Sequence, residues 1–149
     1  MFTQDRDSMR RFFLDAWRKA RDDGAQIEPL EEQIASVVRA HPEYHTLLDD
    51  PDAALSRDFL PESGATNPFL HLSLHLAILE QVTTDRPPGI RTVYHHFVAA
   101  EGNPHQAEHR IMDCLAQALW EAQRSGRPPD ESAYMECLQR LIAAKGPSR

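Results

Sequence analysis

The stretch NPFLHLSLHLAILEQVT, residues 67–83, decides the fold class. It opens with Asn67 and Pro68, an N-cap residue followed by a proline at the first helical position, so it begins a helix. Apolar side chains then occupy nearly every side of that helix, which indicates that it is buried rather than on the surface. The rest of the fold is therefore expected to surround it.

The segments on either side of residues 67–83 also have helical patterns. In residues 3–21, apolar side chains recur at intervals of three and four, as on one face of a helix. Proline and glycine mark the ends of four further helical segments, which are residues 29–40, 90–101, 104–124 and 130–144. Short turns are expected at residues 43–48 and 52–55, and a loop at residues 57–66. Since no segment alternates like a strand, we predict an all-α bundle of five to six helices with short connections rich in proline and glycine.

Length and charge narrow the class of protein. The chain has 149 residues, which favours one helical domain, expected over residues 1–144, with a frayed tail at residues 145–149. It carries 16 Lys and Arg against 23 Asp and Glu, a net charge of −7 that argues against a general nucleic-acid binder. The longest aliphatic run, Leu76–Leu79, is far shorter than the about 20 residues of a membrane span.

The cysteine content favours a cytoplasmic protein. Cys114 and Cys137 are the only two cysteines, and they make no disulfide framework. No apolar secretory segment is visible at the start of the chain. We therefore expect a reducing, cytoplasmic location with Cys114 as a small buried thiol. The expected partner is a small molecule or another protein, with no nucleic acid and no membrane, and a homodimer is left open.

Histidine is the unusual residue type of this sequence. Eight histidines occur, and three pairs of them are four residues apart, which are His41/His45, His71/His75 and His105/His109. Random placement would give about 0.4 such pairs. Residues four apart lie one turn apart on the same face of a helix, so two imidazoles can reach one metal ion. The excess therefore favours a common cause, and metal binding suits this spacing.

His71 and His75 belong to the buried helix. An unpaired buried polar group costs about 1–3 kcal/mol, so both rings need partners. A metal ion would satisfy both rings, and so would hydrogen bonds to a carboxylate, a carbonyl or a buried water. Both interpretations stay open for this pair.

His105, Glu108 and His109 lie together on the helix expected at residues 104–124. Glu108 points into the apolar stripe of that helix, where a lone carboxylate is costly unless it is paired or bound to a metal. Two histidines and a carboxylate suit a divalent transition metal. The alternative is a helix N-terminus that favours Glu108 by its dipole and leaves both rings half exposed. The same residues match the H-x-x-E-H pattern of inverted zinc peptidases, a match too short to assign that activity.

The other four histidines are not among the predicted ligands. Pro42 makes His41 a cap position, so His41 and His45 need not share a face, and a surface turn is expected there. Whether this pair joins the site is left open. His95 and His96 lie opposite the apolar face of their helix and are expected to be solvated.

The chain resembles, over nearly its full length, a family of short bacterial proteins of unknown function. The residues that carry the resemblance are His41–His45, Asn67–His75, Glu80–Gln81, Asp85–Gly89, Ala107–Arg110 and Leu119–Pro129. The resemblance implies membership of that family and no particular activity. A looser similarity of architecture links the expected fold to the metal-binding helical bundles of the DinB-like proteins.

Two functions from different classes follow from these patterns. The first is a helical protein that binds one or two ions of a divalent transition metal, either iron or zinc. The predicted ligands are His71, His75, His105, Glu108 and His109. The alternative is a non-catalytic protein-interaction module whose buried histidines are structural. The sequence assigns no catalytic residue, and it leaves open whether the protein is an enzyme.

Overall fold

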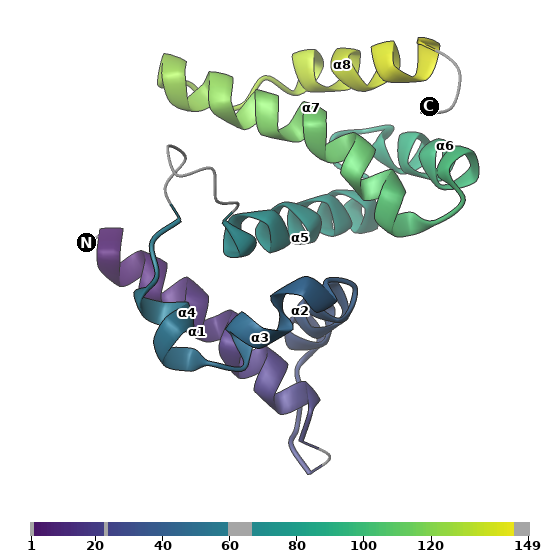
Figure 1. The fold of residues 1–149 in the computed structure, drawn as a ribbon. Helices are drawn as coiled ribbons and strands as arrows, with labels where there is room; N and C mark the ends of the chain where they lie inside the picture. The colour runs from purple at the N-terminus through teal and green to yellow at the C-terminus, as the bar shows by residue number, and fades with distance from the viewer. Residues whose placement is uncertain (1, 23, 60–66, 145–149) are drawn as a thin grey trace. The chain divides into compact units, whose positions relative to one another are not determined.

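The structure is a computed structural model that describes residues 2–22, 24–59 and 67–144. Within these ranges all regular structure is helical, and no strand occurs (Figure 1). The elements are α1 (Phe2–Ala20), α2 (Pro29–Arg39), the 3-10 helix η1 (Pro42–Tyr44), α3 (His45–Leu48), α4 (Pro51–Ser56), α5 (Pro68–Thr84), α6 (Ile90–Glu101), α7 (Pro104–Ser125) and α8 (Glu131–Ala143).

The predicted all-α class is confirmed, and the number of helices is higher than predicted. The described residues form eight α-helices instead of five to six. The additional ones are the short helices α3 and α4, where the sequence pattern indicated turns. Asp50 caps α4 by accepting a hydrogen bond from the backbone of Ala53, and Pro51 occupies the first helical position. Most of the loop expected at residues 57–66, and the tail expected at residues 145–149, lie outside the described residues.

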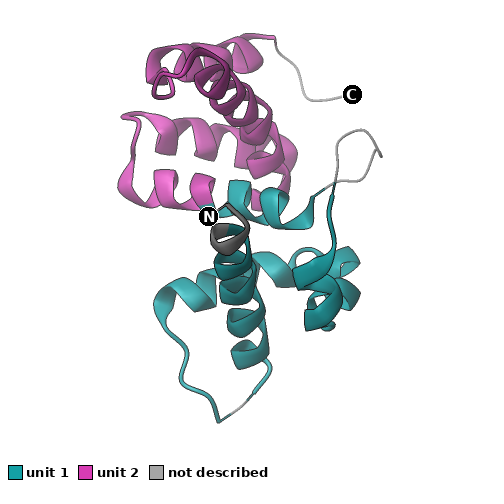
Figure 2. Cartoon of the chain, turned by 90° about the vertical axis from the view of Figure 1, so that its left-hand side faces the viewer, with its two compact units in different colours: residues 1–76 teal, residues 77–149 magenta. Residues whose placement is uncertain are grey.

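The chain divides into two compact units, and the boundary between them falls inside α5 (Figure 2). Unit 1 is Met1–Leu76 and unit 2 is Ala77–Arg149. The single domain expected over residues 1–144 stays a prediction. No helix in the described ranges combines the length and the apolar character that a membrane span requires.

In unit 1, α1 packs against α2 and α4. Its core contains Phe13 of α1, Val38 of α2 and Phe69 of α5, and the rings of Phe13 and Phe69 lie 6.0 Å apart. Arg10 of α1 is buried with them, and its guanidinium donates hydrogen bonds to the carbonyl oxygens of Ala54 (2.9 Å) and Arg57 (2.8 Å). This arginine therefore satisfies backbone carbonyls at the end of α4.

In unit 2, α7 packs against α6 and α8. The connections are short because Gly102 and Gly126 end α6 and α7 with positive φ angles of 89° and 72°, which a residue with a Cβ rarely adopts. The interior contains apolar side chains from each of the three helices, among them Phe97, Ile111 and Leu138.

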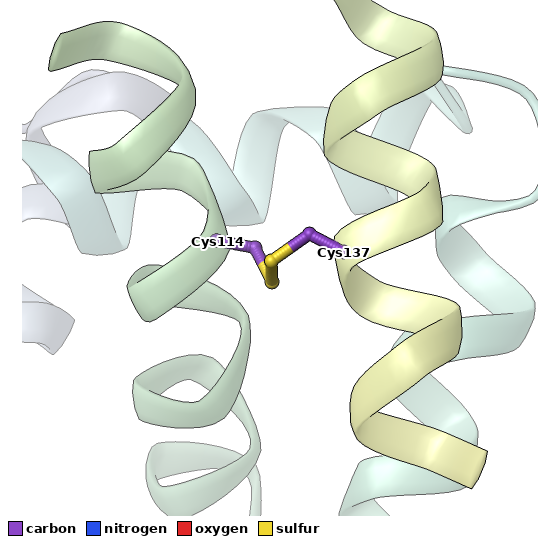
Figure 3. Close-up of a disulfide and its surroundings, with 2 residues drawn as sticks. All are labelled: Cys114 and Cys137. Carbon is purple, nitrogen blue, oxygen red and sulfur yellow. A yellow bond between two sulfur atoms is a disulfide. The ribbon is translucent and has the colours of Figure 1, made fainter. Parts of the chain in front are cut away.

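A disulfide between Cys114 of α7 and Cys137 of α8 joins these two helices in unit 2 (Figure 3). The expectation of free thiols is therefore wrong for this structure, although the predicted burial of Cys114 is correct. The turn after Gly126 brings α8 back beside α7, so that the two Cα atoms lie 5.8 Å apart, within the range that a disulfide requires. Spacing along the sequence does not contain this information.

Candidate metal centre

His71 and His75 lie one turn apart on α5, in unit 1. The side chain of His75 is fully buried and that of His71 is half-buried. Their Nε2 atoms are 3.2 Å apart, and their ring centroids are 4.8 Å apart. The expectation that four-residue spacing puts both rings on one face is therefore confirmed for this pair.

His41 joins these two rings from the turn that follows α2. It is 1 % exposed, and its ring centroid lies 4.6 Å from that of His75 and 5.0 Å from that of His71. The expected surface position is wrong for His41, because Pro42 starts η1 and the ring continues the buried face of α2. His41 lies four residues after Val37, which is on that buried face. This spacing is the sequence signal that could have placed His41 inside.

The hydrogen bond of His41 fixes which of its nitrogens could bind a metal. Nδ1 lies 2.8 Å from the carbonyl oxygen of Val37. A carbonyl only accepts, so Nδ1 carries the hydrogen and Nε2 keeps the lone pair in the neutral ring. A histidine that donates one N–H to a carbonyl and offers the other nitrogen has the arrangement found in most metal sites. Tyr44 stacks on the His41 ring with centroids 5.4 Å apart, which restricts its orientation.

His45 has a different role from His41. Its Nε2 lies 2.8 Å from the carbonyl oxygen of Val38, so Nε2 carries the hydrogen and donates it. Its ring also lies against Trp17 of α1, with centroids 4.7 Å apart. These contacts make His45 a packing residue of unit 1, and the pair His41/His45 does not act as one unit.

His105, Glu108 and His109 lie near the start of α7, in unit 2. Asn103 caps this helix by accepting from the backbone N–H of Gln106. The rings of His105 and His109 are half-buried, and their centroids are 4.4 Å apart. Glu108 is 7 % exposed, as its expected position in the apolar stripe requires.

Tyr94 of α6 connects to this group through Glu108. Its hydroxyl donates to Oε2 of Glu108 at 3.4 Å. Burial, with the charge of Glu108 as a second cause, raises the pKa of Tyr94 above its ordinary value. The phenol therefore remains protonated at neutral pH, and its O–H donates the hydrogen bond that orients the Glu108 carboxylate.

Four histidines among the described residues are candidates for metal ligands, and these are His41, His75, His105 and His109. The predictions from sequence had included three of them and had missed His41. His71 and Glu108 stay predicted ligands. Neither cysteine is available as a ligand, because both are in the disulfide.

A family model described as "Domain of unknown function (DUF1841)" matches residues 5–140 of the chain. The match covers nearly the full length, as the resemblance in the sequence implied. No curated protein matches the chain, and no solved structure matches it.

Proposed function

The chain belongs to the DUF1841 family, and we propose from its histidine geometry that it binds one or two divalent transition-metal ions. The proposed ligands are His41, His71 and His75 in unit 1 and His105, Glu108 and His109 in unit 2. Of these, we infer that His41, His75, His105 and His109 contribute most, and that His71 and Glu108 contribute less.

The three imidazoles of unit 1 carry this proposal. His41, His71 and His75 have ring centroids separated by 4.6 to 5.0 Å in all three combinations. Two of the three rings are at most 1 % exposed. Neutral imidazole nitrogens that meet away from solvent are the ligands that zinc and iron bind near neutral pH.

The separation between His71 and His75 also supports the proposal. Two ligand nitrogens on a tetrahedral zinc ion, each about 2.0–2.1 Å from the metal, lie about 3.3 Å apart. The two Nε2 atoms are 3.2 Å apart, which fits both that geometry and a direct hydrogen bond. If the hydrogen bond is kept in the metal-bound protein, His71 orients His75 instead of binding the ion.

Unit 2 supplies a second set of suitable donors. Two imidazoles and one carboxylate on a single helix turn provide the nitrogen and oxygen ligands typical of zinc and iron sites. The Tyr94 hydrogen bond to Glu108 resembles the outer contacts that orient metal-binding carboxylates. An ion with an open coordination position would support hydrolytic or oxygen chemistry.

The experiment is elemental analysis of full-length protein purified without a metal-affinity tag. We expect stoichiometric iron or zinc in the wild type and loss of that metal in the double variant His75→Ala/His109→Ala. His96→Ala, at an exposed position of α6, is the matched control and should keep the metal. Visible absorption bands would favour iron over zinc.

The alternative function predicts a different result. If the histidines only satisfy one another through hydrogen bonds in an interaction module, metal content will be substoichiometric and will not change in the double variant. That outcome would exclude the metal proposal.

A further inference from the structure

A cleft lies between α7 and α8 in unit 2, and the disulfide forms part of its wall. Its volume is about 340 Å³. Both cysteines line it, together with Glu121, Arg127, Asp130 and Arg140. In Figure 3 the sulfur–sulfur bond bridges the two facing helices. A small molecule in this cleft would therefore meet the disulfide directly.

The two sulfur atoms differ in how accessible their residues are. Cys114 is 1 % exposed, whereas Cys137 is half-buried. Thiol–disulfide exchange requires an attacking thiolate to reach one sulfur atom. Cys137 is therefore the sulfur that an incoming thiol would attack, and Cys114 is the leaving group.

The charges around the cleft favour an anionic thiol. Of its two carboxylates, Glu121 pairs with Arg124 (3.3 Å), whereas Asp130 keeps its charge and accepts from the backbone N–H of Ala133 (3.1 Å). Among the described residues, two arginines therefore face one carboxylate without an ion-pair partner, and the cleft has an excess of positive charge. Within the part of the chain that the structure describes, Arg127 and Arg140 form no ion pair. Two arginines beside the disulfide would attract a negatively charged molecule and would stabilise a thiolate that forms there.

We propose that this cleft is a thiol–disulfide exchange site for small anionic thiols, independent of the metal site. The thiolate of the incoming molecule attacks Sγ of Cys137 and forms a mixed disulfide. The Cys114–Cys137 bond breaks, and Cys114 leaves as a thiolate that takes a proton from water. A second thiol then attacks the mixed disulfide, so that two thiols are oxidised to one disulfide while the protein gains two electrons and two protons.

The packing of α8 allows this exchange without unfolding of the unit. Leu138 is fully buried, and Tyr134 is 4 % exposed with its hydroxyl donating to Oε1 of Gln81 at 2.7 Å. These contacts hold α8 in unit 2 without the covalent bond. The disulfide can therefore open and close while the helices stay in place.

The test measures how fast the native disulfide is reduced, by quenched alkylation and intact-mass analysis at low ionic strength. The probes are glutathione, which is anionic, and 2-mercaptoethanol, which is neutral. We expect Arg127→Gln/Arg140→Gln to slow reduction by glutathione about threefold to tenfold and to slow reduction by 2-mercaptoethanol clearly less, because the attacking thiolate of 2-mercaptoethanol carries a smaller negative charge than that of glutathione. Arg11→Gln/Arg39→Gln, at two exposed arginines of unit 1, is the control with the same loss of charge and should have no effect.

Single cysteine variants give a second test with oxidised glutathione. Cys114→Ser should gain the mass of one glutathione at Cys137, and Cys137→Ser should stay unmodified until it is denatured. Equal modification of the two variants would overturn the proposal. So would equal slowing with both thiols, or a wild-type disulfide that is reduced only after unfolding.

Discussion

The rings of His41 and His75 lie 4.6 Å apart, one in the turn after α2 and the other in the middle of α5. Both side chains are buried, and His41 is oriented by the carbonyl of Val37 and by the ring of Tyr44. Unit 1 therefore brings together two histidines that are far apart in the sequence. The contact with His75 therefore distinguishes His41, which is expected to bind metal, from His45, which only packs.

Replacing His41 by alanine should weaken metal binding, whereas replacing His45 should not. His41→Ala removes a proposed ligand. Loss of a residue that only orients a metal ligand already lowers metal affinity about 10–100-fold, so the affinity for zinc should fall tenfold or more. His45→Ala removes a hydrogen bond to Val38 and a contact with Trp17, so it should lower the melting temperature and leave the metal content intact. Calorimetric titration of the metal-free proteins checks this, and equal affinities in both variants would contradict it.

The helices could be predicted because their signals are local. Asn67 and Asn103, each followed by proline, accept hydrogen bonds from backbone N–H groups just as N-cap residues do. Gly126 ends α7 with a positive φ angle, as its place before a proline pair indicated.

Local signals did not decide the position of His41, although its place four residues after Val37 favoured burial, and they did not reveal the disulfide. His41 is buried because the turn at Pro42 folds back against α5, and a cap residue followed by proline looks the same when the turn is exposed. The pairing of Cys114 with Cys137 depends on how α8 packs against α7, and a two-cysteine sequence does not specify that packing. The four-residue histidine spacing, in contrast, is a helical property and placed His71 beside His75 correctly.

Metal should be released as the pH falls through the range in which histidine protonates. A ligand nitrogen must be unprotonated, so protons and metal compete for the same imidazoles. Half-release is expected on the acid side of neutrality, because bound metal opposes protonation of its ligands. Metal content after dialysis at a series of pH values measures this. Acid unfolding is monitored in parallel by circular dichroism. Metal that is released only at the pH where the protein unfolds would contradict this prediction.

Glu31 should stabilise the fold at neutral pH and lose that effect in acid. Two contacts lower the pKa of Glu31 below its ordinary value of 4.5. The larger cause is a hydrogen bond from the backbone N–H of Glu28, and the second is the ammonium of Lys19, which lies 2.9 Å away. Because the folded-state pKa is lowered, the stabilisation is complete above the unfolded-state pKa and is lost as the pH falls through the lowered value. Glu31→Gln should therefore reduce the free energy of unfolding at pH 7 and flatten its decline below pH 4.5.

Glu32→Gln is the matched control for this prediction, because Glu32 is the adjacent, exposed residue of α2 and pairs with Arg39 only at 3.5 Å. Exposed ion pairs contribute little, so its unfolding curve should be close to that of the wild type. Urea unfolding at several pH values provides the measurement. The same pH dependence in both variants would show that Glu31 has no special role.

Arg10 should be the most sensitive arginine of unit 1. It is 2 % exposed, donates to the carbonyls of Ala54 and Arg57, and lies over the ring of Phe69 at 4.9 Å. Arg10→Ala would leave those carbonyls without their donor and open a cavity, so a loss of about 2–4 kcal/mol in the free energy of unfolding is expected. Arg10→Lys should restore little, because a single ammonium cannot reproduce the flat guanidinium over the ring. Arg11→Ala, at the adjacent exposed position, should change the free energy by less than about 0.5 kcal/mol. Equal destabilisation by Arg10→Ala and Arg11→Ala in urea would show that the buried contacts of Arg10 do not hold α4.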